Sequence, residues 1–85
     1  MIDANACFES DEAFIDYDFE ELMYRWSKSD KKLYMKFYGE RHEQGEANPQ
    51  GKIFTDALMY GIQISREEYD RGRKSIYHPE RNVNL

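Results

Sequence analysis

The sequence has few of the residues that cross-link a fold through disulfides or metals, and it lacks long apolar runs that could cross a membrane. It has one cysteine, Cys7, so no disulfide within the chain is possible, and this thiol with His42 and His78 matches no zinc-ligand spacing. No apolar run approaches the ~20 residues that cross a bilayer, and the first residues lack the basic and apolar regions of a signal peptide. We therefore expect a cytoplasmic protein with no bound metal and no membrane segment.

Motifs for catalysis and cofactor binding are also missing. His42 begins a pattern like the HExxH zinc helix, but Glu46 stands where the second histidine is required. Asp16 begins a spacing like that of a calcium loop, yet Glu21 occupies the position that requires glycine. The sequence contains no glycine-rich phosphate loop and no nucleophile elbow. We expect neither an enzyme nor a cofactor.

Positive charge is absent from the first 24 residues. The net charge is −5, but the region before Arg25 carries −8 and the remainder carries +3. The acids of that region are Asp3, Glu9, Asp11, Glu12, Asp16, Asp18, Glu20 and Glu21. Such asymmetry bears on partners and on association rates rather than on the fold.

Aromatic residues are abundant, and their spacing fits a helix. Seven Tyr, five Phe and one Trp suit both a small core and an interface. Ile15, Phe19, Leu22 and Trp26 lie at i, i+4, i+7 and i+11, which is the spacing of one helical face. This pattern predicts a helix near 11–27, with a start several residues later as an alternative.

Apolar stripes predict three further helices, near 30–44, 52–60 and 66–77. A capping box formed by Ser65 and Glu68 marks the start of the last of them. The segment 45–51 contains two glycines and one proline and is predicted to be a loop. Because no glycine or proline interrupts residues 8–38, one continuous helix in place of the first two is an alternative prediction. The sequence therefore predicts an all-α fold, a small compact bundle of three to four short helices forming one domain over residues 1–85.

A helix at 11–27 would turn an acidic face away from the core. The candidate partner-binding residues on that face are Asp16, Tyr17, Glu20, Glu21 and Tyr24. Like charges four residues apart cost on the order of 0.2–0.5 kcal/mol per pair in an exposed helix. Such a face becomes useful when a protein partner with a basic surface meets it. The alternative is an ordinary solvated face near a helix end.

The predicted function is a non-enzymatic protein-binding module. Carboxylates spaced along a rod can imitate phosphates, so we expect an inhibitor that blocks a nucleic-acid-binding protein. Small acidic, aromatic-rich proteins that phages make to block host nucleic-acid-binding machinery are similar in general character, without a shared motif. A phage-type accessory or counter-defence protein is therefore the analogy that composition supports.

Two other functions stay open. The helices predicted on either side of residues 61–64 resemble a helix-turn-helix, with four candidate nucleic-acid contacts, Arg66, Arg71, Arg73 and Lys74. Against DNA binding, segment 65–77 sums to only +1, and its N-terminal residues include Glu67 and Glu68. The second alternative is a self-assembling structural protein, in which the aromatic helices form a homodimer.

Overall fold

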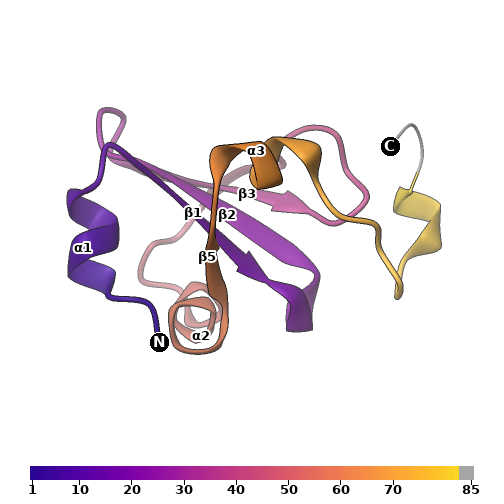
Figure 1. Cartoon of the computed structure of the whole chain (residues 1–85), viewed down its shortest axis with the longest axis horizontal. Coiled ribbons are helices and arrows are strands. Elements are labelled where there is room, and N and C mark those ends of the chain that lie inside the picture. The colour runs from indigo at the N-terminus through magenta and orange to yellow at the C-terminus, as the bar shows by residue number, and fades with distance from the viewer. Residues whose placement is uncertain (83–85) are drawn as a thin grey trace.

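The computed structural model describes residues 1–82 and is built around an antiparallel sheet of five strands in the order β4-β3-β2-β1-β5 (Figure 1). The strands are β1 (Glu12–Tyr17), β2 (Leu22–Ser27), β3 (Lys32–Phe37), β4 (Gly45–Ala47) and β5 (Ile62–Ile64). The helices are α1 (Ala4–Glu9), α2 (Lys52–Tyr60) and α3 (Arg66–Arg71), with 3-10 turns η1 (Asp18–Glu20) and η2 (Pro79–Arg81). The prediction of an all-α bundle was wrong.

The three long strands follow a period of two. In β2, Leu22, Tyr24 and Trp26 point to one side of the sheet, and each pairs with a residue of β1 and one of β3 whose side chain shares that side. Aromatic and β-branched residues favour such half-buried pleated surfaces. Two tight turns join the strands, and each contains a non-glycine residue in the left-handed region, Glu21 with φ 52° and Lys31 with φ 54°. The segment 11–38 therefore folds as a meander.

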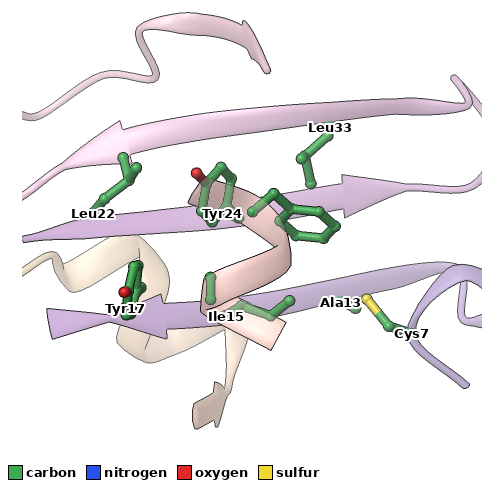
Figure 2. Packing of buried hydrophobic residues seen from close by; sticks show 9 residues of the cluster. Cys7, Ala13, Ile15, Tyr17, Leu22, Tyr24 and Leu33 are labelled. Carbon is green, nitrogen blue, oxygen red and sulfur yellow. The ribbon is translucent and has the colours of Figure 1, made fainter. Parts of the chain in front are cut away.

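The larger core lies between the sheet and the helices α1 and α2. Figure 2 shows Tyr17 and Leu22 at one end of this core and Cys7 and Ala13 at the other. Phe54 of α2 is 1% exposed and packs against the strands at the middle of the layer, with its ring 5.0 Å from that of Tyr24. The layer carries most of the buried apolar surface, which supplies the main stabilisation of the fold.

A smaller core lies on the opposite side of the sheet, under α3. Its members are Phe14, Met23, Tyr38, Ile64 and Tyr69. Figure 1 shows α2 and α3 on opposite sides of the sheet, which is therefore covered on both faces. Because residues of both parities along β1 and β2 are buried, the simple alternation of apolar and polar residues is blurred in the sequence.

The predicted helices can now be compared with the elements observed. The predicted helix 11–27 is the hairpin of β1 and β2, and the predicted helix 30–44 is β3 followed by irregular chain. The helix predicted at 52–60 is confirmed as α2, while the loop predicted at 45–51 includes the short strand β4. The single domain over residues 1–85 stays a prediction. Within residues 1–82 no helix is both long and apolar enough to cross a bilayer.

The helix predicted at 66–77 is shorter than expected. Its capping box is present, because the Glu68 amide donates to the Ser65 hydroxyl and the Ser65 amide donates to the Glu68 carboxylate. The helix ends at Arg71 because Gly72 adopts φ 75°, which favours glycine, and an irregular segment follows. We call residues 72–78 the C-terminal coil.

Candidate functional site

The end of the sheet where β1 turns into β2 holds two buried carboxylates. Asp16 is 5% exposed and Glu21 is 3% exposed, and they flank η1 on either side. Burying a carboxylate is costly unless it is paired or hydrogen-bonded. Both acids therefore need partners, and both find them in or near the C-terminal coil.

Asp16 is held by a tyrosine and an arginine. The Tyr38 hydroxyl donates to Asp16 Oδ1 at 2.5 Å, and Arg73 Nε lies 2.7 Å from Oδ2. The Arg73 Nε–H is not aligned as a hydrogen bond, so its contact is an ion pair. Burial raises the pKa of Asp16, and it outweighs the lowering effects of the Tyr38 hydrogen bond and the Arg73 charge.

Glu21 fixes the C-terminal coil to the turn. Its carboxylate accepts hydrogen bonds from the Ser75 hydroxyl, from the Ile76 amide at 2.7 Å and from the Tyr77 amide at 3.2 Å. Although burial raises the pKa of Glu21, these hydrogen bonds outweigh it and hold the pKa below its usual value. The backbone of the coil is therefore anchored, while the side chains of Ile76 and Tyr77 stay in solvent.

The five residues predicted to bind a partner do not share one face. Tyr17 and Tyr24 are buried in the larger core, 6% and 3% exposed, whereas Asp16 and Glu21 contact the C-terminal coil. Only Glu20 is exposed. The outward helical face assumed for this group does not exist, because residues 12–17 and 22–27 are strands with period two. A role of these residues in partner binding stays a prediction.

Large apolar side chains gather in solvent around the same turn. Phe19 is 75% exposed and Tyr60 is 69% exposed, and together with Tyr17 and Asp18 they line a depression of about 270 Å³. Beyond Asp18 lies a second depression of about 640 Å³, whose apolar lining is Ile62, Ile76 and Tyr77. These three side chains are also mostly exposed. The helical spacing in the sequence placed Phe19 on the same face as Ile15, Leu22 and Trp26, and it gave no signal for this exposed group.

The four candidate nucleic-acid contacts do not lie together on one helix that could enter a DNA groove. Residues 62–64 form the strand β5 and α3 has only six residues, so the helix-turn-helix prediction was wrong. Arg66 lies 2.7 Å from a Glu12 oxygen, and Arg73 is paired with Asp16. Arg71 and Lys74 have no ion pair among the described residues, and both line the larger depression.

A second polar cluster lies on the α3 side of the sheet. Arg25 forms a two-pronged contact with Glu43, with Nε 2.7 Å from Oε2 and a terminal nitrogen 3.0 Å from Oε1. The Tyr69 hydroxyl also donates to Glu43, at 2.7 Å. The hydrogen bond from Arg25 is the main reason that the pKa of Glu43 lies below its usual value. This arrangement ties the chain after β3 to the sheet and to α3, and sequence reasoning gave no signal for it.

The lowered pKa of Glu43 predicts an acid-sensitive contribution to stability. A carboxyl whose pKa is lower in the folded state stabilises the fold above its unfolded pKa of about 4.3, and this contribution is lost as pH falls through the folded pKa. Glu43→Gln should therefore lower the urea midpoint at pH 7 and lower it less at pH 3, when the midpoints are measured by circular dichroism. Glu67→Gln, at an exposed position of α3, is the control. An equal loss at both pH values would contradict a role for the ionised carboxylate.

Comparison with known proteins gives a consistent result in sequence and in structure. A model of the family described as Tis1 immunity protein matches residues 1–73. "Immune protein Tis1" of Pseudomonas aeruginosa (strain UCBPP-PA14) is 37% identical over 71 residues, which are 84% of this chain and 92% of that protein. The crystal structure of the complex between the type VI effector Tas1 and its immunity protein contains a chain with 35% identity and a TM-score of 0.81, over 88% of this chain and 99% of that one. The chain therefore belongs to the Tis1 immunity protein family.

Proposed function

We propose that this chain is an immunity protein that binds a type VI effector directly and neutralises it. The observation that carries the proposal is the likeness, over nearly the whole fold, to a chain crystallised in complex with the effector Tas1. The family match over residues 1–73 covers the whole sheet and all three helices. A protein partner also suits a small surface rich in exposed aromatic residues.

The partner is proposed to present basic residues to the β1–β2 turn. Asp18 and Glu20 are exposed there, and neither has a cationic partner within 4.0 Å in the described part of the chain. Charge complementarity of this kind speeds association and selects partners. If the effector's basic surface normally holds a nucleic acid, these carboxylates would take the place of phosphates, and the chain would act by occupying that surface.

The five acidic and aromatic residues singled out in the sequence have distinct proposed roles. Glu20 contacts the partner, because it alone among them is exposed. The other four position the turn: Tyr17 and Tyr24 anchor it in the larger core, while Asp16 and Glu21 attach the C-terminal coil to it. The cytoplasmic location and the homodimer stay predictions, and sedimentation at two concentrations would test the second.

The direct test uses Tas1 as the probe. Isothermal titration of Tas1 with this chain is expected to give a Kd on the order of micromolar or tighter, as specific interfaces of standard size do. Co-expression of the chain in bacteria that produce Tas1 should restore growth. A titration without heat of binding, together with no rescue of growth, would overturn the proposed function.

Charge reversal at the turn is expected to weaken binding moderately. Glu20→Lys should raise the Kd for Tas1 by roughly 3-fold to 10-fold, mainly through a slower association rate, because a charge at an interface rim acts chiefly on encounter. The difference should shrink in high salt, since ions screen exposed charges. Asp11→Lys, which reverses an exposed acid at the opposite end of β1, is the matched control. Equal effects of the two reversals would show that only net charge matters.

A further inference from the structure

Within residues 1–82, eight large apolar side chains are exposed, and five of them lie around one end of the sheet. They are Phe19, Tyr60, Ile62, Ile76 and Tyr77, which we call the turn-end patch. The two depressions lined by these side chains share Asp18, so they adjoin each other at η1, with this carboxylate between their apolar walls. Exposed apolar side chains gathered in this way and rimmed by polar residues mark interaction sites in soluble proteins.

The patch is rigidly presented. Tyr60 is the last residue of α2, and Ile62 lies in β5, where it pairs with Asp16 of β1. Phe19 lies in η1 between two buried anchors, Tyr17 and Glu21. Because the backbone that carries these side chains is already ordered, binding does not have to order it, which favours affinity.

The C-terminal coil contributes the remaining two side chains, Ile76 and Tyr77. It is held in place by the buried carboxylate of Glu21. The amides of Ile76 and Tyr77 donate to Glu21, whereas their side chains are 83% and 71% exposed. A coil ordered only for stability would turn such side chains toward the sheet, because burial of apolar surface is the main stabilising contribution. Figure 1 shows the coil after α3 running past the end where β1 turns into β2. The arrangement holds two large apolar residues beside η1 in solvent.

Charge around the patch specifies the chemistry of its occupant. Asp18 lines both depressions and Glu20 ends η1, while Arg71 and Lys74 line the larger depression. None of these four forms an ion pair among residues 1–82. A complementary surface carries an apolar side chain that enters the depression between Phe19 and Tyr60, a basic residue beside η1 and an acidic residue facing the coil.

We propose that the turn-end patch is the surface on which the effector docks, with Phe19 and Tyr60 as its central anchors and Ile76 and Tyr77 as its flank. This inference rests on the proposed function. Exposed aromatic anchors in the centre of an interface carry most of its binding energy, and the surrounding contacts exclude water. The flank lies beyond residue 73, where the family match ends, so it enlarges a surface whose centre belongs to the family-matching region.

The test is titration of Tas1 with the unaltered chain and three variants. Phe19→Ala combined with Tyr60→Ala should raise the Kd by about 100-fold, since two hot-spot aromatics are truncated. Ile76→Ala combined with Tyr77→Ala should raise it by about 10-fold, because flanking contacts contribute less. Met59→Ala is the control: Met59 is 44% exposed and adjoins Tyr60 in sequence, but it lines a separate depression with Met1 and Ile2. All substituted side chains are exposed, so thermal midpoints should stay close to that of the unaltered chain.

The outcomes separate the two proposals. Binding by the unaltered chain with no loss in the Phe19 and Tyr60 double variant would overturn the patch and leave the proposed function standing. A loss in that variant without a loss in the Ile76 and Tyr77 variant would remove the flank from the surface. A loss as large in Met59→Ala would show that the effects are not specific to the patch, and would also overturn it. No binding by the unaltered chain would overturn the proposed function and the patch together.

Discussion

Phe54→Ala is expected to lower the free energy of unfolding by about 3–5 kcal/mol, the usual cost of removing a buried phenylalanine. The side chain is 1% exposed, and its ring makes an edge-on contact with Tyr24 and a tilted contact with Phe8. It is the central residue between α2 and the sheet, so its loss leaves a cavity that neither α1 nor the strands can fill. A domain of this size has a total stability of only ~4–13 kcal/mol. The variant should therefore lose a large fraction of its stability.

Urea unfolding followed by Trp26 fluorescence measures this loss. Trp26 lies on the same side of the sheet as Phe54, and its indole N–H donates to the Phe8 carbonyl, so unfolding of this layer should change its emission. Ile53→Ala is the matched control, because Ile53 precedes Phe54 in α2 and is 49% exposed. It should cost roughly 1 kcal/mol or less. Similar losses in the two variants would mean that α2 contributes through helix formation rather than through packing.

The strands could have been recognised from two short stretches. Leu22, Tyr24 and Trp26, and likewise Leu33 and Met35, lie two residues apart, which is the period of a strand. The same region also contains an i, i+4, i+7, i+11 series, and the helical interpretation chose that series. It failed because Phe14 and Met23, which break the alternation, are buried by α3 on the other face. A single sequence does not show that a sheet is covered on both sides.

Signals within a short segment were more reliable than a periodicity extended over many residues. The capping box of Ser65 and Glu68 correctly located the start of α3, and the helix at 52–60 was confirmed. These succeed because capping and short amphipathic helices depend on neighbouring residues. Asp3, whose side chain accepts from two amides of α1, is an N-cap of the same kind, although the predicted helices did not include α1.

The charge pattern predicted the class of function better than it predicted the residues. A small non-enzymatic inhibitor that binds a protein agrees with membership of an immunity protein family. The acids at 16 and 21 were expected to face a partner, yet both are buried and attach the C-terminal coil to the turn. Their partners, Arg73 and Ser75, lie more than fifty residues away in sequence. No local pattern distinguishes a carboxylate that contacts a partner from one that is matched across the fold.

Arg73→Met is expected to lower the free energy of unfolding at pH 7 by about 2–4 kcal/mol. Breaking a buried ion pair from one side typically costs 3–5 kcal/mol, and the effect is discounted here because the Arg73 side chain is 39% exposed. The substitution leaves the Asp16 carboxylate, 5% exposed, with the Tyr38 hydroxyl as its one hydrogen-bond donor in the described chain. Methionine fills similar volume, so the loss reflects charge rather than a cavity. Urea unfolding measures it, with Arg71→Met as the control at an exposed position without an ion pair in residues 1–82.

The pH dependence of this loss distinguishes an ion pair from simple packing. Removing Arg73 takes away a charge that lowers the pKa of Asp16, so burial should raise that pKa further in the variant. An acid whose pKa is raised in the folded state binds its proton more readily there, and stability therefore rises as pH falls through the raised value. The difference between the variant and the unaltered chain should thus shrink from pH 7 to pH 4. A constant difference would mean that Arg73 acts through its aliphatic stem, and that the buried carboxylate does not need its charge.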